Sequence, residues 1–257
     1  MPEGDTLHNT ALRLRPALVG RRLATVSFPR LRGVDRVKAG DLVTRIESRG
    51  KYLEIEVDRG LVVRSHLQMT GSWDLYRRGD RWRKPRHLAR AVLETDAAAA
   101  VCFSAPVVEI GRPGDGRLDH LGPDLCVAPV DIDEILRRVA AWADPRAEIA
   151  EVLLEQRLAA GIGNVYKCET LFACGVDPFL PLADVAPAMQ RSLYETAAAQ
   201  LQANLGRGRR ATFGDGLAVY GRDRQGCRVC GAGISSRIQG GQGRRTWWCP
   251  RCQPSLG

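Results

Sequence analysis

The chain has 257 residues, and its 38 lysines and arginines outnumber 29 acidic residues, which gives a formal net charge of +9 and a sequence pI of about 9.5. No run of residues is apolar over the length needed to cross a bilayer. The first residues show neither the basic nor the apolar region of a signal peptide. These features argue against a membrane or exported protein and favour a cytoplasmic one. The excess of positive charge predicts a polyanionic partner.

The first residues also offer a candidate nucleophile. Loss of Met1 would expose the secondary amine of Pro2, which can condense with a sugar aldehyde to form a cationic iminium. An α-amino group titrates near about 7.7 to 8.0, so the site has to favour the unprotonated amine. Glu3 is a candidate proton donor to the leaving base or to the sugar ring oxygen. The alternative is that Pro2 is an ordinary first-turn proline of a helix.

A helix is predicted directly behind this dipeptide. Apolar residues recur at helical spacing at Leu7, Ala11, Leu14 and Leu18. The positive end of the helix dipole would then lie next to Pro2 and disfavour its protonated amine. Pro16 is expected to kink or end this helix.

The rest of the first half is typical of short β-strands. Residues 51–57 alternate apolar and polar side chains, as expected of a half-buried strand. Further β-rich segments lie at 22–28, 41–47, 61–68, 88–95 and 100–104. Several short strands at close spacing indicate a sandwich or barrel.

After Pro129 the pattern becomes helical. The expected helices cover residues 131–143, 147–159, 164–174 and 187–205. In the segment 160–166, two glycines precede Asn164, which is predicted to be the N-cap of the next helix, with backbone amides directed at an anion. A plain turn between helices is the alternative.

Eight cysteines divide into two groups. The C-x2-C pairs Cys227/Cys230 and Cys249/Cys252 are separated by 18 residues, a spacing typical of a structural zinc ribbon. We expect one Zn2+ held by four thiolates, with chance spacing or disulfides as the alternative. The remaining cysteines are expected to be reduced core residues, namely Cys102, Cys126, Cys168 and Cys174.

Positive charge is concentrated around this cysteine motif. Between Leu205 and Gly257 there are ten arginines and two acidic residues, a net charge of +8. The arginines alternate with the cysteine pairs and with Trp247-Trp248, which favours a nucleic-acid surface over a simply solvated charged segment.

Several motifs occur together in one chain order and resemble a known family. The chain resembles the formamidopyrimidine-DNA glycosylase / endonuclease VIII family, bifunctional enzymes that excise oxidised bases and cut the DNA backbone. The motifs are Pro2-Glu3-Gly4, Ser48–Leu53, His66–Trp73, Leu121–Leu125, the helix-two-turn-helix stretch Leu153–Pro178, Tyr220-Gly221-Arg222 and Arg244–Cys249.

The resemblance implies roles for the first of these residues. Pro2 is similar to the nucleophile that forms a Schiff base with the damaged nucleotide, and Glu3 to the proton donor. Lys51, expected on a strand, is similar to a lysine that contacts a phosphate near the lesion and assists at the sugar.

The resemblance implies DNA contacts as well. Asn164, with Gly163 before it, is similar to the asparagine that grips a backbone phosphate, and Arg244 to a catalytically required arginine that clamps phosphates flanking the flipped nucleotide. Arg222 belongs to a DNA-binding motif. Met69 is similar to a residue that fills the gap left by the extruded base, although a core methionine is the alternative.

Three departures from the family pattern narrow the expected class of damaged base. Thr6 stands where many members have a glutamate, the Arg and Phe wedge of purine-directed members is replaced by Pro106–Ile110, and the cysteine spacing is slightly long. The first two departures favour the endonuclease VIII branch and oxidised pyrimidines. A purine-directed formamidopyrimidine-DNA glycosylase is the alternative.

The resemblance also implies an architecture. We expect an α+β multidomain protein, with an N-terminal β-sandwich catalytic domain over 1–128, a helical helix-two-turn-helix domain over 129–222 and a four-cysteine zinc finger over 223–257. The expected partner is damaged duplex DNA with a flipped-out lesion, bound by a monomer associated with the nucleoid.

Two functions of other classes are alternatives to this one. A catalytically silent protein that binds damaged DNA would keep the zinc ribbon and the helices but lose Pro2, Glu3 and Lys51, which are all present. An isomerase that uses an N-terminal proline on small molecules would leave the zinc motif and the basic C-terminal segment unexplained.

Overall fold

The computed structural model describes residues 2–31, 37–241 and 243–255. The predicted loss of Met1 therefore concerns a residue outside the described ones. The chain divides into two compact units, Met1–His120 and Leu121–Gly257, which are called unit 1 and unit 2. No helix in the described part of the chain combines the length and the apolarity that a membrane crossing requires.

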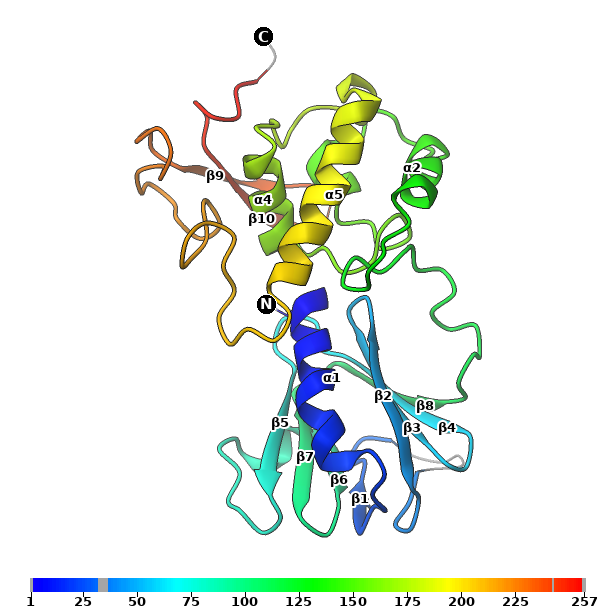
Figure 1. Ribbon diagram of the computed structural model, residues 1–257. Coiled ribbons are helices and arrows are strands. Elements are labelled where there is room, and N and C mark those ends of the chain that lie inside the picture. The colour runs from blue at the N-terminus through cyan, green and yellow to red at the C-terminus, as the bar shows by residue number, and fades with distance from the viewer. Residues whose placement is uncertain (1, 32–36, 242, 256–257) are drawn as a thin grey trace. The chain divides into compact units, whose positions relative to one another are not determined.

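Unit 1 begins with the helix α1, Gly4–Leu18. Its predicted apolar positions are all buried, and they join one core with residues of the strands (Figure 1). Pro16 lies within the helix, which ends two residues later. A proline in the last turn removes only one hydrogen bond of the helix, so it does not prevent the helix from reaching Leu18.

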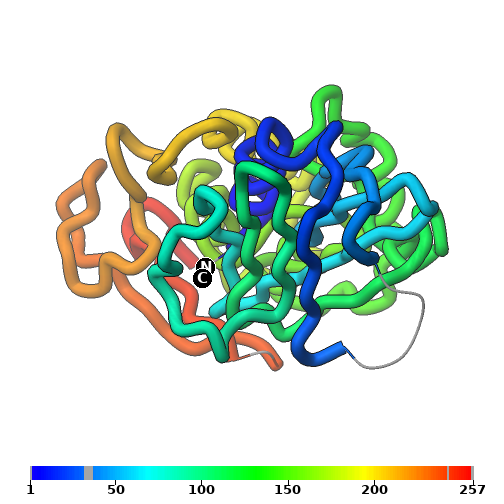
Figure 2. The backbone as a smooth tube through the Cα atoms, turned by 90° about the horizontal axis from the view of Figure 1, so that it is seen from below, coloured from blue at the N-terminus to red at the C-terminus, as the bar shows by residue number. Residues whose placement is uncertain are grey.

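Two four-stranded antiparallel sheets make up the rest of unit 1 and confirm the expected sandwich. Figures 1 and 2 show α1, in dark blue, alongside both sheets. One sheet has the strand order β1 (Thr25–Ser27), β6 (Ala89–Glu94), β7 (Ala98–Phe103), β5 (Ser72–Arg77). The other has the order β2 (Val43–Arg49), β3 (Tyr52–Val57), β4 (Leu61–His66), β8 (Val107–Gly111).

Two of these strands, β5 and β8, were not predicted from the sequence. β8 has no alternating burial pattern, and all five of its residues are half-buried. It becomes a strand because it pairs with β4 at the edge of the sheet, from Val62↔Gly111 to His66↔Val107. A strand that forms through such pairing need not show a local alternation of apolar and polar residues.

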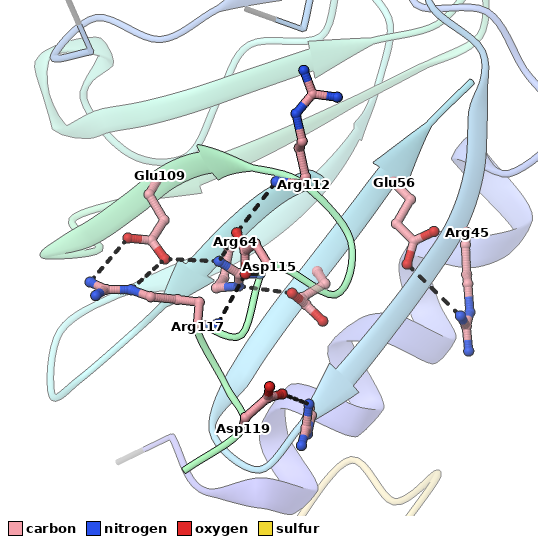
Figure 3. Close-up of polar contacts among 10 residues, drawn as sticks. Arg45, Glu56, Arg64, Glu109, Arg112, Asp115, Arg117 and Asp119 are labelled. Carbon is pink, nitrogen blue, oxygen red and sulfur yellow. Dashed lines mark hydrogen bonds and ion pairs between the residues drawn. The ribbon is translucent and has the colours of Figure 1, made fainter. Parts of the chain in front are cut away.

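One arginine lies inside unit 1 and links the sheet to the segment after β8. The Arg64 side chain is 3% exposed. It donates to Glu54 at 2.8 Å, to Glu109 at 3.2 Å and to both oxygens of Asp115 at 3.1 and 3.3 Å (Figure 3). Burial acts to lower the pKa of Arg64, but the hydrogen bonds outweigh it, so the pKa is raised. The cluster holds the segment containing Asp115 and Arg117 against the sheet.

Unit 2 is mainly helical. Its longest helix, α5, packs against α4 and α2 around a second core (Figure 1). The helices are α2 (Ile132–Ala140), α3 (Ile149–Val152), α4 (Asn164–Ala173) and α5 (Pro187–Ala203). All four predicted helices are therefore present, and three of them end within three residues of the predicted bounds.

The helix predicted over 147–159 was wrong in length, because α3 ends at Val152. The following backbone makes hydrogen bonds outside any helix: Ala160 donates to Pro123 O at 2.9 Å and accepts from Leu125 N at 3.1 Å. The Gln156 side chain also bonds Ile162 O and the N–H of Gly161. Within the predicted helix itself, Arg157 N donates to the Glu155 carboxylate at 3.0 Å and Gln156 O accepts from Gly122 N at 2.9 Å, so these backbone groups are not available to a continuing helix.

Unit 2 ends with a two-stranded hairpin, β9 (Ser235–Gln239) and β10 (Arg244–Trp248). A third cluster of buried residues supports it, namely Cys168, Phe172, Ala218, Val219, Cys227, Ile234 and Cys249. Since two strands alone are marginally stable in water, the hairpin depends on this cluster and on the cysteine site described below.

Candidate functional site

The predicted nucleophile lies at the start of α1. Glu3 is the N-cap of the helix and its residue is fully buried, while Pro2 before it is half-buried. The backbone oxygen of Glu3 accepts from Thr6 N at 3.0 Å and from Leu7 N at 3.2 Å. The first turn therefore holds Glu3 in one place, and Pro2 lies at the positive end of the helix dipole, as predicted.

Thr6 completes this turn. Its hydroxyl accepts from the backbone N–H of Glu3 at 3.2 Å, and the Asp5 carboxylate accepts from Thr6 N at 2.7 Å and from its hydroxyl at 3.2 Å. At the third helical position, a side chain that accepts from the N-cap N–H is the return bond of a capping box. Thr6 thus supplies an acceptor at the position where many family members have a glutamate.

Lys51 was predicted on a strand and instead lies in a turn. Arg49 pairs with Tyr52, so Gly50 and Lys51 form a two-residue connection between β2 and β3. Gly50 has φ of 59° at the first central position, which is typical of a type II′ hairpin turn. The turn presents the lysine at the end of the hairpin, and its side chain is half-buried.

His66 lies beside this hairpin. Its ring packs edge-on against Tyr52 with 4.7 Å between the centroids, and its Nδ1 accepts from Gln68 N at 3.2 Å. Burial, and secondarily the positive charge of Lys51, lower the pKa of His66 below its ordinary value of 6.5. A neutral imidazole is therefore favoured next to the lysine.

Met69 follows in the connection between β4 and β5. It is 58% exposed, so the alternative of a core methionine is excluded. Gln68 before it has φ of 46°, and the hydroxyl of Thr70 after it donates to Ser104 O at 3.3 Å. The turn thus presents an apolar side chain to solvent, as a residue that enters a DNA stack requires.

In unit 2, the predicted N-cap Asn164 is instead the first residue of α4. Gly163 is the N-cap and Asn164 is the first helical residue. Gly163 has an extended backbone, and the Asn164 side chain bonds the hairpin instead of capping α4. Its Nδ2 donates to Arg245 O at 2.8 Å, while its buried Oδ1 has no hydrogen-bond partner among the described residues.

Arg244 lies on the hairpin, where it is paired with Gln239 across the two strands. Its half-buried side chain lines a cavity of unit 2 together with Lys167 and Gln239. Because Asn164 bonds the carbonyl of Arg245, the N-terminal end of α4 is joined directly to the strand that carries Arg244.

Arg222, also predicted to bind DNA, is engaged within its own segment. Its guanidinium donates to Ala218 O at 2.5 Å, to Gly226 O at 2.9 Å and to Gln225 at 3.2 Å. These contacts hold the turn that leads into the first cysteine pair.

The sequence analysis missed Glu169, which organises the same segment. Its residue is 1% exposed, and its carboxylate accepts from the N–H groups of Ala218, Val219 and Tyr220 at 2.6 to 2.9 Å. An acidic residue in the apolar middle of α4 was the available signal, since a buried carboxylate requires several donors.

The cysteine pairs come together as predicted. Cys227, Cys230, Cys249 and Cys252 have sulfur atoms within 4.8 Å of one another, with 3.9 Å between Cys227 and Cys252 and 3.5 Å between Cys230 and Cys249. A tetrahedral ion with metal–sulfur bonds of about 2.3 Å requires sulfur separations of about 3.8 Å. The cluster therefore fits a tetrahedral metal site.

Comparison with known proteins agrees with this arrangement. The chain matches the formamidopyrimidine-DNA glycosylase N-terminal domain over residues 1–106 and the formamidopyrimidine-DNA glycosylase H2TH domain over 121–213. It is 41% identical to the probable endonuclease 8 2 of Streptomyces coelicolor, over 98% of this chain and 94% of the relative. It is 38% identical to the DNA-(apurinic or apyrimidinic site) lyase Nei2 of Mycolicibacterium smegmatis, over 98% and 99%.

A solved structure shows the same fold. Lactococcus lactis Fpg (MutM), in a complex with DNA that contains an oxidised pyrimidine, superposes with a TM-score of 0.84 and 24% identity, over 99% of this chain and 100% of that one. With the two domain matches and the relatives near 40% identity, the chain belongs to the formamidopyrimidine-DNA glycosylase / endonuclease VIII family of DNA-repair glycosylases and lyases, in its endonuclease VIII-like branch.

Proposed function

We propose that this protein is a bifunctional DNA glycosylase and abasic-site lyase that removes oxidised pyrimidines and cuts the backbone by β,δ-elimination. The observation that carries the proposal is the start of α1, where Pro2 precedes the fully buried Glu3 at the positive end of the helix. The matched family and the relative named as an abasic-site lyase support it.

In the proposed first step, the amine of Pro2 attacks the sugar carbon that bears the damaged base. Glu3 donates a proton to the base or to the ring oxygen, so that the base leaves and the sugar ring opens. The backbone bonds of Glu3 to Thr6 and Leu7 keep this carboxyl next to Pro2. Removal of Met1 is part of the proposal, because only a terminal proline has a free amine.

The second stage uses the iminium as an electron sink. A secondary amine yields an iminium that cannot lose a nitrogen proton, so the positive charge persists and acidifies the neighbouring sugar carbon. Loss of that proton expels the 3′ phosphate, and a second elimination expels the 5′ phosphate. Lys51, at the tip of its hairpin, is proposed to hold a phosphate near this sugar.

The DNA-binding residues are proposed to act through the phosphates. Asn164 and Gly163 at the start of α4 and Arg244 on the hairpin would fix the duplex by its backbone, and Met69 would enter the stack in place of the flipped base. Arg222 would contribute by shaping the turn that it bonds. One Zn2+ held by the four cysteines would stabilise the hairpin in its folded form.

The preference for pyrimidines rests on the connection between β7 and β8. Only residues 104–106 separate these strands, and Val107 and Val108 are paired within β8. The arginine and phenylalanine wedge of purine-directed members has no counterpart here. We accordingly propose a monomer that acts on damaged duplex DNA, with working parts over 1–128, 129–222 and 223–257.

Borohydride trapping on a duplex with one abasic site tests the chemistry. Reduction converts an iminium into a stable amine, so the protein should become covalently attached to DNA once loss of Met1 is confirmed by mass. A form extended before Pro2, in which its nitrogen is an amide, should bind DNA without attachment, and Pro2→Ala should trap far less. If the wild-type protein binds DNA and never attaches, the catalytically silent binder becomes the better explanation.

Paired duplexes test the lesion class. The protein should release an oxidised pyrimidine faster than an oxidised purine from otherwise identical DNA, and phosphate at both ends of the gap would report δ-elimination. A faster reaction on the purine would favour the purine-directed alternative.

A further inference from the structure

A buried chain of polar groups runs beneath the hairpin of unit 2. The Nζ of Lys167, on α4, donates to the hydroxyl of Thr246 at 2.7 Å, and this hydroxyl bonds Gln239 Oε1 at 2.5 Å. The amide nitrogen of Gln239 donates in turn to Glu148 at 2.6 Å and to Pro178 O at 3.0 Å. Lys167, Thr246 and Gln239 are 1%, 0% and 7% exposed. The chain therefore links α4 to both strands of the hairpin without relying on water.

The register of the hairpin places this chain around Arg244. Gln239 is the residue directly opposite Arg244 in the ladder, and Thr246 is two positions further along β10. Since side chains alternate between the two faces of a strand, Arg244, Thr246 and Gln239 share one face. Lys167, Gln239 and Arg244 also line the same cavity. Both neighbours of Arg244 on its face are thus held by the polar chain.

A second bond from the same helix reaches the backbone of the same strand. Asn164, on α4 like Lys167, donates to Arg245 O at 2.8 Å. Two residues of one helix, less than one turn apart, therefore bind consecutive residues of β10. Such a double attachment limits both sliding and rotation of the strand against α4.

The presence of lysine at this position calls for an explanation. Only four of the 38 basic residues of the chain are lysines, and burial of an ammonium group is costly unless its hydrogen bonds are satisfied. An apolar side chain of similar length would fill the space at lower cost. The metal site lies at the other end of the strands, since Cys249 follows Trp248, and it leaves the Arg244 end to be oriented by other contacts.

We propose that Lys167 is a positioning residue that acts through Thr246 and Gln239 to orient Arg244 toward a DNA phosphate. The inference rests on the proposed function, in which Arg244 binds that phosphate. The zinc site then determines whether the hairpin is folded, and the Lys167 chain determines where its arginine points.

A double-mutant cycle on DNA affinity tests this assignment. Lys167→Met keeps the length of the side chain and removes its charge and its donor, and Thr246→Val removes the hydroxyl while keeping the shape. Each is combined with Arg244→Ala. Thr246→Ser keeps the hydroxyl and serves as the matched control. Zinc content and the unfolding transition of every variant confirm that the hairpin remains folded and metal-loaded.

Loss of a charge-assisted phosphate contact in Arg244→Ala should weaken binding roughly 10- to 100-fold. Lys167→Met and Thr246→Val should weaken it in the same direction with zinc content unchanged, and they should add little once Arg244 is absent. Thr246→Ser should restore affinity. At saturating DNA, Lys167→Met and Thr246→Val should be trapped by borohydride at a rate closer to that of the wild type than their affinities are. The reason is that orientation of a binding residue affects mainly KM.

Two different failures are distinguishable. If Lys167→Met weakens binding by the same factor with and without Arg244, the effects are additive and the positioning role is overturned while the proposed function survives. If Arg244→Ala itself leaves affinity and trapping unchanged, the proposed role of Arg244 fails, and with it the inference. Loss of zinc from Lys167→Met would likewise overturn the inference, because the lysine would then support the metal site.

Discussion

The sandwich of unit 1 and the β9–β10 hairpin of unit 2 each present residues proposed to act on DNA, but they are stabilised by different interactions. Around α1, a continuous apolar core of more than a dozen fully buried side chains holds the start of the helix. The hairpin has two strands, a small buried cluster in which Cys227 and Cys249 take part, and a chain of polar contacts.

The two units are therefore sensitive to different changes. Pro2 and Glu3 are placed by hydrophobic burial, which is distributed over many residues and tolerates the loss of one contact. Arg244 is placed by a few directional bonds and a metal site, so the loss of any one of them removes a large share of its support.

Removal of zinc should give the largest effect. Binding of a structural zinc ion contributes about 10 to 16 kcal/mol to folding of small zinc domains, so chelation should unfold the hairpin and abolish DNA binding. Unit 1 should keep its β-structure, as followed by circular dichroism, and added zinc should restore binding. Full DNA affinity after measured release of the metal would show that the hairpin does not depend on the metal site.

Loss of the buried arginine of unit 1 should come next. Arg64→Met leaves Glu54, Glu109 and Asp115 without their shared partner, and breaking a buried ion cluster on one side costs about 3 to 5 kcal/mol. The free energy of unfolding in denaturant measures the effect. Arg117→Met is the matched control, because Arg117 is 65% exposed and also pairs with Glu109. Equal losses in the two variants would show that burial of Arg64 is not what matters.

The first turn of α1 should respond more weakly. Thr6→Val removes the hydroxyl that accepts from Glu3 N, and loss of a helix cap costs typically about 1 kcal/mol. We expect a small loss of unfolding free energy together with slower borohydride trapping, because the backbone of Glu3 is less firmly held. Thr6→Ser, which retains the acceptor, should behave like the wild type. Unchanged trapping in Thr6→Val would show that the Thr6 hydroxyl does not contribute to the reaction.

The smallest effect should be a pH dependence from His66. Its pKa is lowered in the folded protein, first by burial and then by Lys51, from the ordinary value of 6.5. The unfolded chain therefore binds more protons below that pH, and the stability that neutral His66 contributes is lost as pH falls from about 6.5 through the folded pKa. His66→Gln should flatten this part of the stability curve of unit 1. An identical slope in the variant would assign the dependence to other groups.

Some features of the protein were determined by the sequence alone. The spacing of Leu7, Ala11, Leu14 and Leu18 predicted α1 because burial of one helical face depends only on local order. The two C-x2-C pairs predicted the cysteine cluster because ligand spacing is itself local. The ordered motifs resembled the family that the comparisons confirmed.

Other features were decided only by tertiary structure, because they depend on partners far apart in the chain. β8 exists through its pairing with β4. α3 ends at Val152, and beyond it Gln156 O accepts from Gly122 N and Ala160 bonds Pro123 and Leu125. Glu169 and Lys167 lie on an ordinary helical pattern, and their roles arise from segments some 50 and 79 positions away. A sequence pattern reports which face of an element is buried, whereas the identity of the groups that meet a buried charge is known only once the chain has folded.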